Sequence, residues 1–207
     1  MFGKLLTVQL PTSDLYYKGF SIFEDPYIIM DLEKLLNDIS KMFDCLNIPY
    51  LVTGSLAYNI YSLPRATRDI DVIIELSLED VPDFIKAIEG NYYFNQHTIY
   101  DEVKRRGMFN IIHLHSSYKV DIILRSNDPF EIAKFQRRKQ MDLLGNKIYV
   151  ITLEDLVISK LRWIQQLESE LHKRDIISLL QSQDVDFQYI KGWCNKLNLN
   201  TFNLIAE

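Results

Sequence analysis

The sequence predicts an α/β (α+β) protein that ends in a helical C-terminal part, and three observations lead to this fold class. Residues 50–52 form a short apolar run typical of a strand, and the small pair Gly54 and Ser55 opens a helix after it. Residues 69–76, DIDVIIEL, are rich in Ile and Val and predict a central strand. Beyond residue 151 the apolar pattern is helical throughout. Strands and helices therefore alternate first, and helices alone follow.

The other elements of the N-terminal part follow from periodicity and turn residues. Residues 1–27 give only weak signals. After them, apolar residues recur at three- and four-residue spacing and predict a helix that Asn47 and Pro49 end. Periodicity and turn residues place helices over 28–46, 54–63 and 78–88, and further strands over 111–115, 118–124 and 147–151.

The C-terminal part begins with a helix-capping signal. Thr152 followed by Asp155 resembles a capping box with Asp in place of Glu, which is typical of a helix N-terminus. Three helical stretches fill the remainder of the chain. We therefore expect a core domain over residues 1–150 and a C-terminal helical subdomain over residues 151–207.

Composition indicates a soluble globular protein. Hydrophobic residues make up 47% and charged residues 25% of the 207 residues. No stretch reaches the roughly 18 to 20 uncharged apolar residues that cross a bilayer, and the N-terminus lacks the apolar run of a secretory signal. We expect a cytoplasmic protein with no membrane partner. The two cysteines, Cys45 and Cys194, lie in predicted amphipathic helices and are interpreted as small buried side chains, not as zinc ligands or a disulfide framework.

The net charge argues against a protein that binds nucleic acid nonspecifically through many phosphate contacts. The formal net charge is -5, whereas nonspecific nucleic-acid affinity comes from clustered Lys and Arg. A local basic cleft remains compatible with this charge. The densest positive run, KFQRRKQ at 134–140, is either a contact for an RNA acceptor or a solvated helix end.

Two carboxylates carry the main chemical signal. Asp69 and Asp71 are two residues apart in a predicted strand, so their side chains project from the same face. A divalent cation between them offsets their repulsion, and hard oxygen ligands suit Mg²⁺ or Mn²⁺. Asp121 joins them if its strand pairs beside theirs, as a third metal ligand or as the base that takes a proton from an acceptor hydroxyl. A solvated strand end is the alternative for each of the three.

The turn upstream of the carboxylates has the features of a phosphate site. Gly54 and Ser55 lie between a strand and a helix, where backbone N–H groups and the helix dipole favour a phosphate. Arg65 and Arg68 flank the loop that leads back to Asp69. Arg68 is the expected fork donor to a phosphate, with a surface ion pair as the alternative. A triphosphate and a metal would then meet in one cleft.

Lys160 is the anomalous residue of the C-terminal part. It falls in the centre of the apolar stripe of its helix, where an unpaired ammonium is costly. Its interpretations are a lysine whose stem covers apolar surface, a partner for a triphosphate, or an ion pair with a structural carboxylate such as Asp175.

The string LVTGSLAYNIYSLPRATRDIDVII resembles the signature of the DNA polymerase beta superfamily of nucleotidyltransferases, in which a Gly-Gly or Gly-Ser turn precedes an Asp-x-Asp or Asp-x-Glu pair. Within it, residues 45–190 are similar to AbiEii-like nucleotidyltransferases, which include toxins of type IV toxin–antitoxin systems. The resemblance implies a mixed sheet with flanking helices, Mg²⁺ or Mn²⁺, an NTP substrate, and catalytic roles for Lys160 in VISKLRW and Asp175 in HKRDII. Ser55 stands where many relatives have a second glycine, and Asp121 matches by motif context only.

These residues predict an enzyme that transfers a nucleoside monophosphate from an NTP to an acceptor hydroxyl and releases pyrophosphate. The acceptor stays open between an RNA 3′ end such as that of tRNA, a protein and a small molecule, and a cognate antitoxin is an expected partner. The alternative is a catalytically weak nucleotide-binding module that regulates a partner protein. His113 and His115 alternate on one strand face but lack a third ligand, so we interpret them as strand-face histidines and not as a metal pair.

Overall fold

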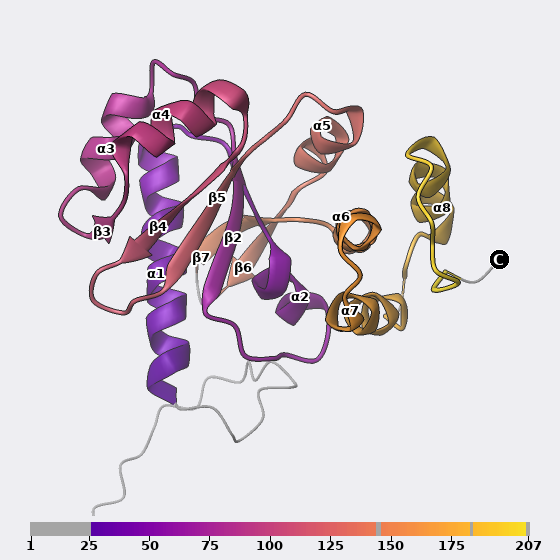
Figure 1. Cartoon of the computed structure of the whole chain (residues 1–207). Coiled ribbons are helices and arrows are strands. Elements are labelled where there is room, and N and C mark those ends of the chain that lie inside the picture. The colour runs from indigo at the N-terminus through magenta and orange to yellow at the C-terminus, as the bar shows by residue number, and fades with distance from the viewer. Residues whose placement is uncertain (1–25, 144–145, 183, 206–207) are drawn as a thin grey trace, which may run out of the picture.

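A seven-stranded mixed sheet in the order β3-β4-β5-β2-β1-β7-β6 forms the centre of the protein (Figure 1). The computed structural model describes residues 26–143, 146–182 and 184–205, so the weak signals of residues 1–25 lie outside the described part. The strands are β1 (Tyr50–Thr53), β2 (Asp69–Ile74), β3 (Tyr92–Tyr93), β4 (Met108–His113), β5 (Lys119–Leu124), β6 (Lys139–Leu143) and β7 (Asn146–Val150).

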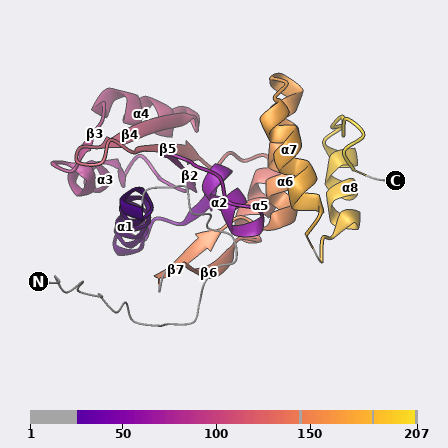
Figure 2. The same cartoon turned by 90° about the horizontal axis from the view of Figure 1, so that it is seen from below.

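Eight helices accompany this sheet within the described ranges, and the last three form the helical C-terminal part. Helices α6, α7 and α8 lie together beyond one side of the sheet, next to α2 (Figures 1 and 2). The helices are α1 (Pro26–Cys45), α2 (Gly54–Tyr61), α3 (Val81–Ile88), α4 (Gln96–Arg105), α5 (Pro129–Gln136), α6 (Leu153–Gln166), α7 (Glu170–Leu180) and α8 (Phe187–Lys196).

Pairing in the middle of the sheet fixes which side chains meet. Strand β2 pairs antiparallel with β1 and parallel with β5, while β1 also pairs parallel with β7. Alternate residues of β2, Ile70, Val72 and Ile74, are fully buried, because they face the core while the intervening positions face the other side. The predicted central strand and the mixed sheet are thus confirmed.

Helix α2 connects the sheet to the helical part. The Tyr61 hydroxyl donates to the Ile151 carbonyl at 2.7 Å, and the Ser62 and Ser178 hydroxyls share a hydrogen bond between α2 and α7. The predicted cap is present, since the Thr152 hydroxyl accepts from the Asp155 N–H and donates to the Asp155 carboxylate at 2.7 Å. The element after the Gly54 turn is therefore packed against both parts of the chain.

Some elements differ from the sequence-based expectation. Helices α4 and α5 and strands β3 and β6 have no counterpart among the predicted elements. The expected strand over 111–115 is β4, which begins at Met108 and ends at His113. Cys194 is buried as predicted, but the prediction was wrong for Cys45, which is exposed. None of the helices in the described ranges combines the length and the apolar character needed to cross a bilayer.

Candidate active site

Three carboxylates lie on one face of the paired strands β2 and β5. Asp71 stands directly opposite Asp121 in the parallel register, and Asp69 stands opposite Lys119. Burial is the main cause that raises the pKa of Asp71, and the carboxylates of Asp121 and Asp69 raise it further. The strand pairing thus places the three acidic residues that the sequence pattern singles out on one face of neighbouring strands.

The Gly54 turn lies directly against this carboxylate cluster. Gly54 has φ of +66°, and a Cβ at its position would lie 1.9 Å from Oδ2 of Asp71. The next residue, Ser55, donates its backbone N–H to the Asp71 carboxylate. Thr53, the N-cap of α2, makes no side-chain cap hydrogen bond. Because Gly54 has a positive φ and lies against the Asp71 carboxylate, only glycine fits at the start of α2.

Lys119 is a residue of this cluster that the motif reading missed. Its ammonium nitrogen lies 2.9 Å from Oδ2 of Asp121 and 3.7 Å from Oδ1 of Asp69. The hydrogen bond to Asp121 raises the pKa of Lys119, so the side chain stays charged at neutral pH. Its position two residues before Asp121 was the available signal, because such residues share a strand face.

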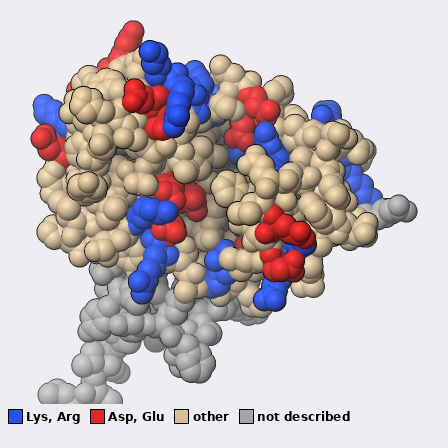
Figure 3. All heavy atoms as spheres, in the orientation of Figure 1, with Lys and Arg blue, Asp and Glu red and all other residues tan. Residues whose placement is uncertain are grey.

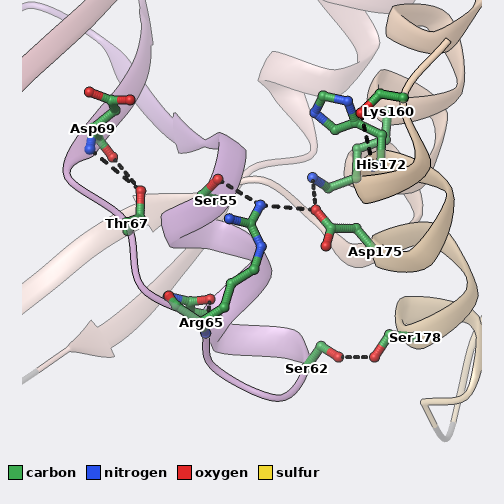
Figure 4. Close-up of polar contacts among 11 residues, drawn as sticks. Ser55, Ser62, Arg65, Thr67, Asp69, Lys160, His172, Asp175 and Ser178 are labelled. Carbon is green, nitrogen blue, oxygen red and sulfur yellow. Dashed lines mark hydrogen bonds and ion pairs between the residues drawn. The ribbon is translucent and has the colours of Figure 1, made fainter. Parts of the chain in front are cut away.

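Arg65 contacts Ser55 and Asp175 from the loop between α2 and β2. The Asn59 side chain fixes the backbone of Arg65 through hydrogen bonds at 2.8 and 3.0 Å. Nη2 of Arg65 then donates to the Ser55 hydroxyl at 2.9 Å and to Oδ2 of Asp175 at 3.1 Å (Figure 4). Arg68 is exposed and forms no ion pair with the described residues.

Lys160 and Asp175 form a buried ion pair between α6 and α7. Nζ of Lys160 lies 2.8 Å from Oδ2 of Asp175, the oxygen that Arg65 also contacts (Figure 4). Burial lowers the pKa of Lys160, and the hydrogen bond to Asp175 opposes that shift. Both cations also lie near the Tyr58 ring, at 5.6 Å for Lys160 and 5.4 Å for Arg65. Of the three interpretations of Lys160, the structure shows the ion pair with the carboxylate of Asp175.

Comparison with known proteins identifies the fold. No family model and no curated protein sequence matches the chain. Among solved structures, the solution structure of the antibiotic-resistance factor ANT(2'')-Ia superimposes with a TM-score of 0.58 at 11% identity, covering 82% of this chain and 92% of that one. The chain has the nucleotidyltransferase fold. At this identity the shared property is the fold.

Two further structures agree with this assignment. ANT(2'')-Ia in complex with adenylyl-2''-tobramycin gives a TM-score of 0.55 at 11% identity over 81% of this chain and 97% of that one. An antigenic nucleotidyltransferase-like protein from Paracoccidioides brasiliensis gives a TM-score of 0.50 at 16% identity. The match covers 81% of this chain and 88% of that one. The nucleotidyltransferase fold is thus shared over most of both chains in each comparison.

The two histidines lie away from the carboxylates. His113 and His115 line a cavity of about 440 Å³ together with Lys34 and Asp38 of α1. Nδ1 of His113 is 2.8 Å from the Ser116 hydroxyl. Within the described ranges, no three His, Cys, Asp or Glu side chains are gathered as a metal-binding group, and this holds for Asp69, Asp71 and Asp121 as well as for the histidines. His113 ends β4, and His115 lies in the turn that follows, with 5.7 Å between the two ring centroids, so the expectation that both histidines lie on a strand face was wrong for His115.

The basic run 134–140 spans the end of α5 and the start of β6. Lys134 is buried and paired with Glu131 at 2.7 Å. Arg137 contacts Asp155 at 3.2 Å and lies 3.8 Å from the Tyr189 ring centroid. On the face shown in Figure 3, acidic and basic side chains alternate in small groups and form no basic band. The interpretation as a solvated helix end thus fails for Lys134, which is buried, and agrees with the exposure of Arg137 and Lys139.

Gly54→Ala should destabilise the chain and reduce any activity of the site. Alanine at φ of +66° is strained, and its Cβ would displace the Asp71 carboxylate. We expect a loss of about 2 kcal/mol in unfolding free energy, from denaturant titration. Gly90→Ala is the matched control, because Gly90 has φ of +82° but nothing within 4 Å of the added Cβ. Equal losses for both variants would show that contact with Asp71 does not constrain Gly54.

Proposed function

We propose that the chain is a metal-dependent nucleotidyltransferase that moves a nucleoside monophosphate from an NTP to an acceptor hydroxyl and releases pyrophosphate. One observation supports this most directly. Asp71 and Asp121 stand opposite each other beside the Gly54 turn, with Asp69 on the same face, in a chain with the nucleotidyltransferase fold. Carboxylates beside a helix N-terminus place metal ligands next to backbone N–H groups that can donate hydrogen bonds to a phosphate.

The donor set is chemically suited to Mg²⁺ or Mn²⁺. All three side chains offer hard carboxylate oxygens. The pKa of Asp71 is raised first by burial and then by the carboxylates of Asp121 and Asp69, whose repulsion a dication would relieve. Asp69, Asp71 and Asp121 would hold the ion, which supplies charge neutralisation at the transferring phosphoryl group. In this proposal Asp121 also accepts the proton of the attacking hydroxyl at a carboxylate oxygen.

Four polar groups are proposed to hold the triphosphate. Ser55 presents its hydroxyl at the start of α2, and Arg65 reaches that hydroxyl at 2.9 Å. Nε of Arg65 is buried without a hydrogen-bond partner among the described residues, so it has a donor left for an anion. Lys160 retains two further N–H donors beside its bond to Asp175. Arg68 is exposed and would contact the outer phosphates.

The core domain of residues 1–150 and the helical subdomain of residues 151–207 would enclose the nucleotide between them. Arg65 and Ser55 come from the first part, and Lys160 and Asp175 from the second, and they already meet through hydrogen bonds. The similarity to AbiEii-like enzymes extends this proposal to an acceptor such as tRNA or a protein and to a cognate antitoxin. The complex of ANT(2'')-Ia with adenylyl-2''-tobramycin makes a small-molecule acceptor the other class to test.

The test is to incubate the purified chain and Mg²⁺ with each NTP in a cell extract, once with label on the α-phosphate and once on the γ-phosphate. Transfer of a nucleoside monophosphate labels the acceptor from the α position only. Separation of protein, RNA and small molecules then identifies the acceptor class. Label from the γ position would indicate phosphoryl transfer instead. NTP binding without any labelled product would favour the regulatory nucleotide-binding module.

A further inference from the structure

An ammonium group contacts the oxygens that the proposed metal site needs. Nζ of Lys119 lies 2.9 Å from Asp121 Oδ2 and 3.7 Å from Asp69 Oδ1. These two carboxylates belong to neighbouring strands, and Lys119 stands opposite Asp69 in the register of β2 and β5. Strand geometry therefore places this lysine on the same face as the carboxylates.

Lys119 differs from the other cations around the site. Lys160 and Arg65 both contact Asp175, which is outside the carboxylate cluster. Among the described residues, Lys119 is the only cation that forms an ion pair with a carboxylate of the cluster, and its partners are Asp69 and Asp121. A carboxylate oxygen engaged by an ammonium at 2.9 Å cannot at the same time bind a dication at about 2.1 Å without bringing the two cations into repulsion.

We propose that Lys119 is a positioning residue that competes with the divalent cation for Asp69 and Asp121. This inference rests on the proposed function, since it concerns the same carboxylates. The ammonium partly neutralises the cluster and holds the Asp121 carboxylate in place. A metal ion must displace it before Asp69 and Asp121 can become ligands.

This competition has a consequence for the order of binding. A metal ion can bind the carboxylates only after the Lys119 contacts break. The affinity of the metal ion for the chain without nucleotide is therefore reduced. A triphosphate bound nearby adds negative charge that can attract both the metal ion and the released ammonium. Metal binding is therefore expected to be weak without nucleotide and to strengthen when an NTP is present.

The experiment measures Mn²⁺ binding to the full chain without nucleotide, by electron paramagnetic resonance of the free ion and by calorimetry. Lys119→Met and Lys119→Gln remove the competing charge, and both are expected to bind Mn²⁺ about tenfold more tightly than the wild type. Lys119→Arg keeps the charge and should stay close to the wild type. Lys86→Met is the control, because Lys86 is exposed on α3 and its loss changes only the net charge.

The outcomes separate this inference from the proposed function. Asp71→Asn chains serve as the reference for binding outside the cluster. Mn²⁺ binding that requires Asp71 but is no tighter in Lys119→Met and Lys119→Gln would overturn the role of Lys119 alone. Mn²⁺ binding that is the same with and without Asp71 in every Lys119 background would overturn the metal site itself. Tighter binding in Lys86→Met as well would show that net charge, and not the Lys119 contact, sets the affinity.

Discussion

Asp71→Asn should abolish nucleotidyl transfer while the chain melts at the same temperature or slightly higher. The substitution removes one charged ligand from the proposed metal site, and charge neutralisation of this kind is worth several kcal/mol. At 1.36 kcal/mol per factor of ten, the expected loss of rate is about a thousandfold or more. Stability does not fall, because burial and the neighbouring carboxylates already make the Asp71 charge costly in the folded chain. Labelled-product assays and melting curves measure the two effects.

The pH dependence of stability gives an independent check on Asp71. Its pKa is raised in the folded chain, so its ionisation lowers stability as the pH rises through that pKa. Without metal, Asp71→Asn should therefore be more stable than the wild type near neutral pH, and this difference in stability should disappear as the pH falls to about 4. Asp101→Asn, an exposed carboxylate change on α4, is the control that should alter neither property. Undiminished labelling by Asp71→Asn would contradict the metal assignment.

The elements with strong local signals could be predicted from sequence. Strand β2 was found because its Ile and Val residues alternate with Asp69 and Asp71, and α6 because Thr152 caps it. Helix α5 also carried a signal, since Asp128 accepts from the N–H groups of Phe130 and Glu131 and Pro129 occupies the first turn. The sequence-based prediction did not include this helix.

Strand register and side-chain reach could not be predicted. Asp71 and Asp121 meet because β2 and β5 pair in parallel, and no local pattern specifies that neighbour. Arg65 and Arg68 both flank the loop before Asp69, and the sequence does not show which of them contacts Ser55. In the structure the Asn59 side chain holds the backbone of Arg65, which turns its guanidinium toward Ser55 and Asp175. Such a clamp depends on the folded loop and not on residue spacing.

Asp175→Asn is expected to cause the largest loss of stability among the site variants. The Asp175 side chain is 3% exposed and serves as counter-ion to Lys160, which is 6% exposed, and to Arg65. Removal of one partner from a buried ion pair leaves charge without compensation, which costs roughly 3 kcal/mol or more. Denaturant unfolding of the full chain measures this loss. Lys160→Met is the matched variant and should lose less, because Asp175 keeps Arg65 as its partner.

The loss should also depend on pH in a direction that identifies Lys160 as the affected group. Burial lowers the pKa of Lys160 in the folded chain, and the Asp175 hydrogen bond is the main influence that raises it. Without Asp175 the charged ammonium is penalised more strongly, and the penalty is relieved as Lys160 deprotonates. The destabilisation of Asp175→Asn should therefore be largest near neutral pH and shrink as the pH approaches about 10. The double variant Asp175→Asn with Lys160→Met should be less destabilised than the sum of the single changes. Additive losses, or a loss that does not change with pH, would contradict Asp175 as the counter-ion of Lys160 and leave only a packing role.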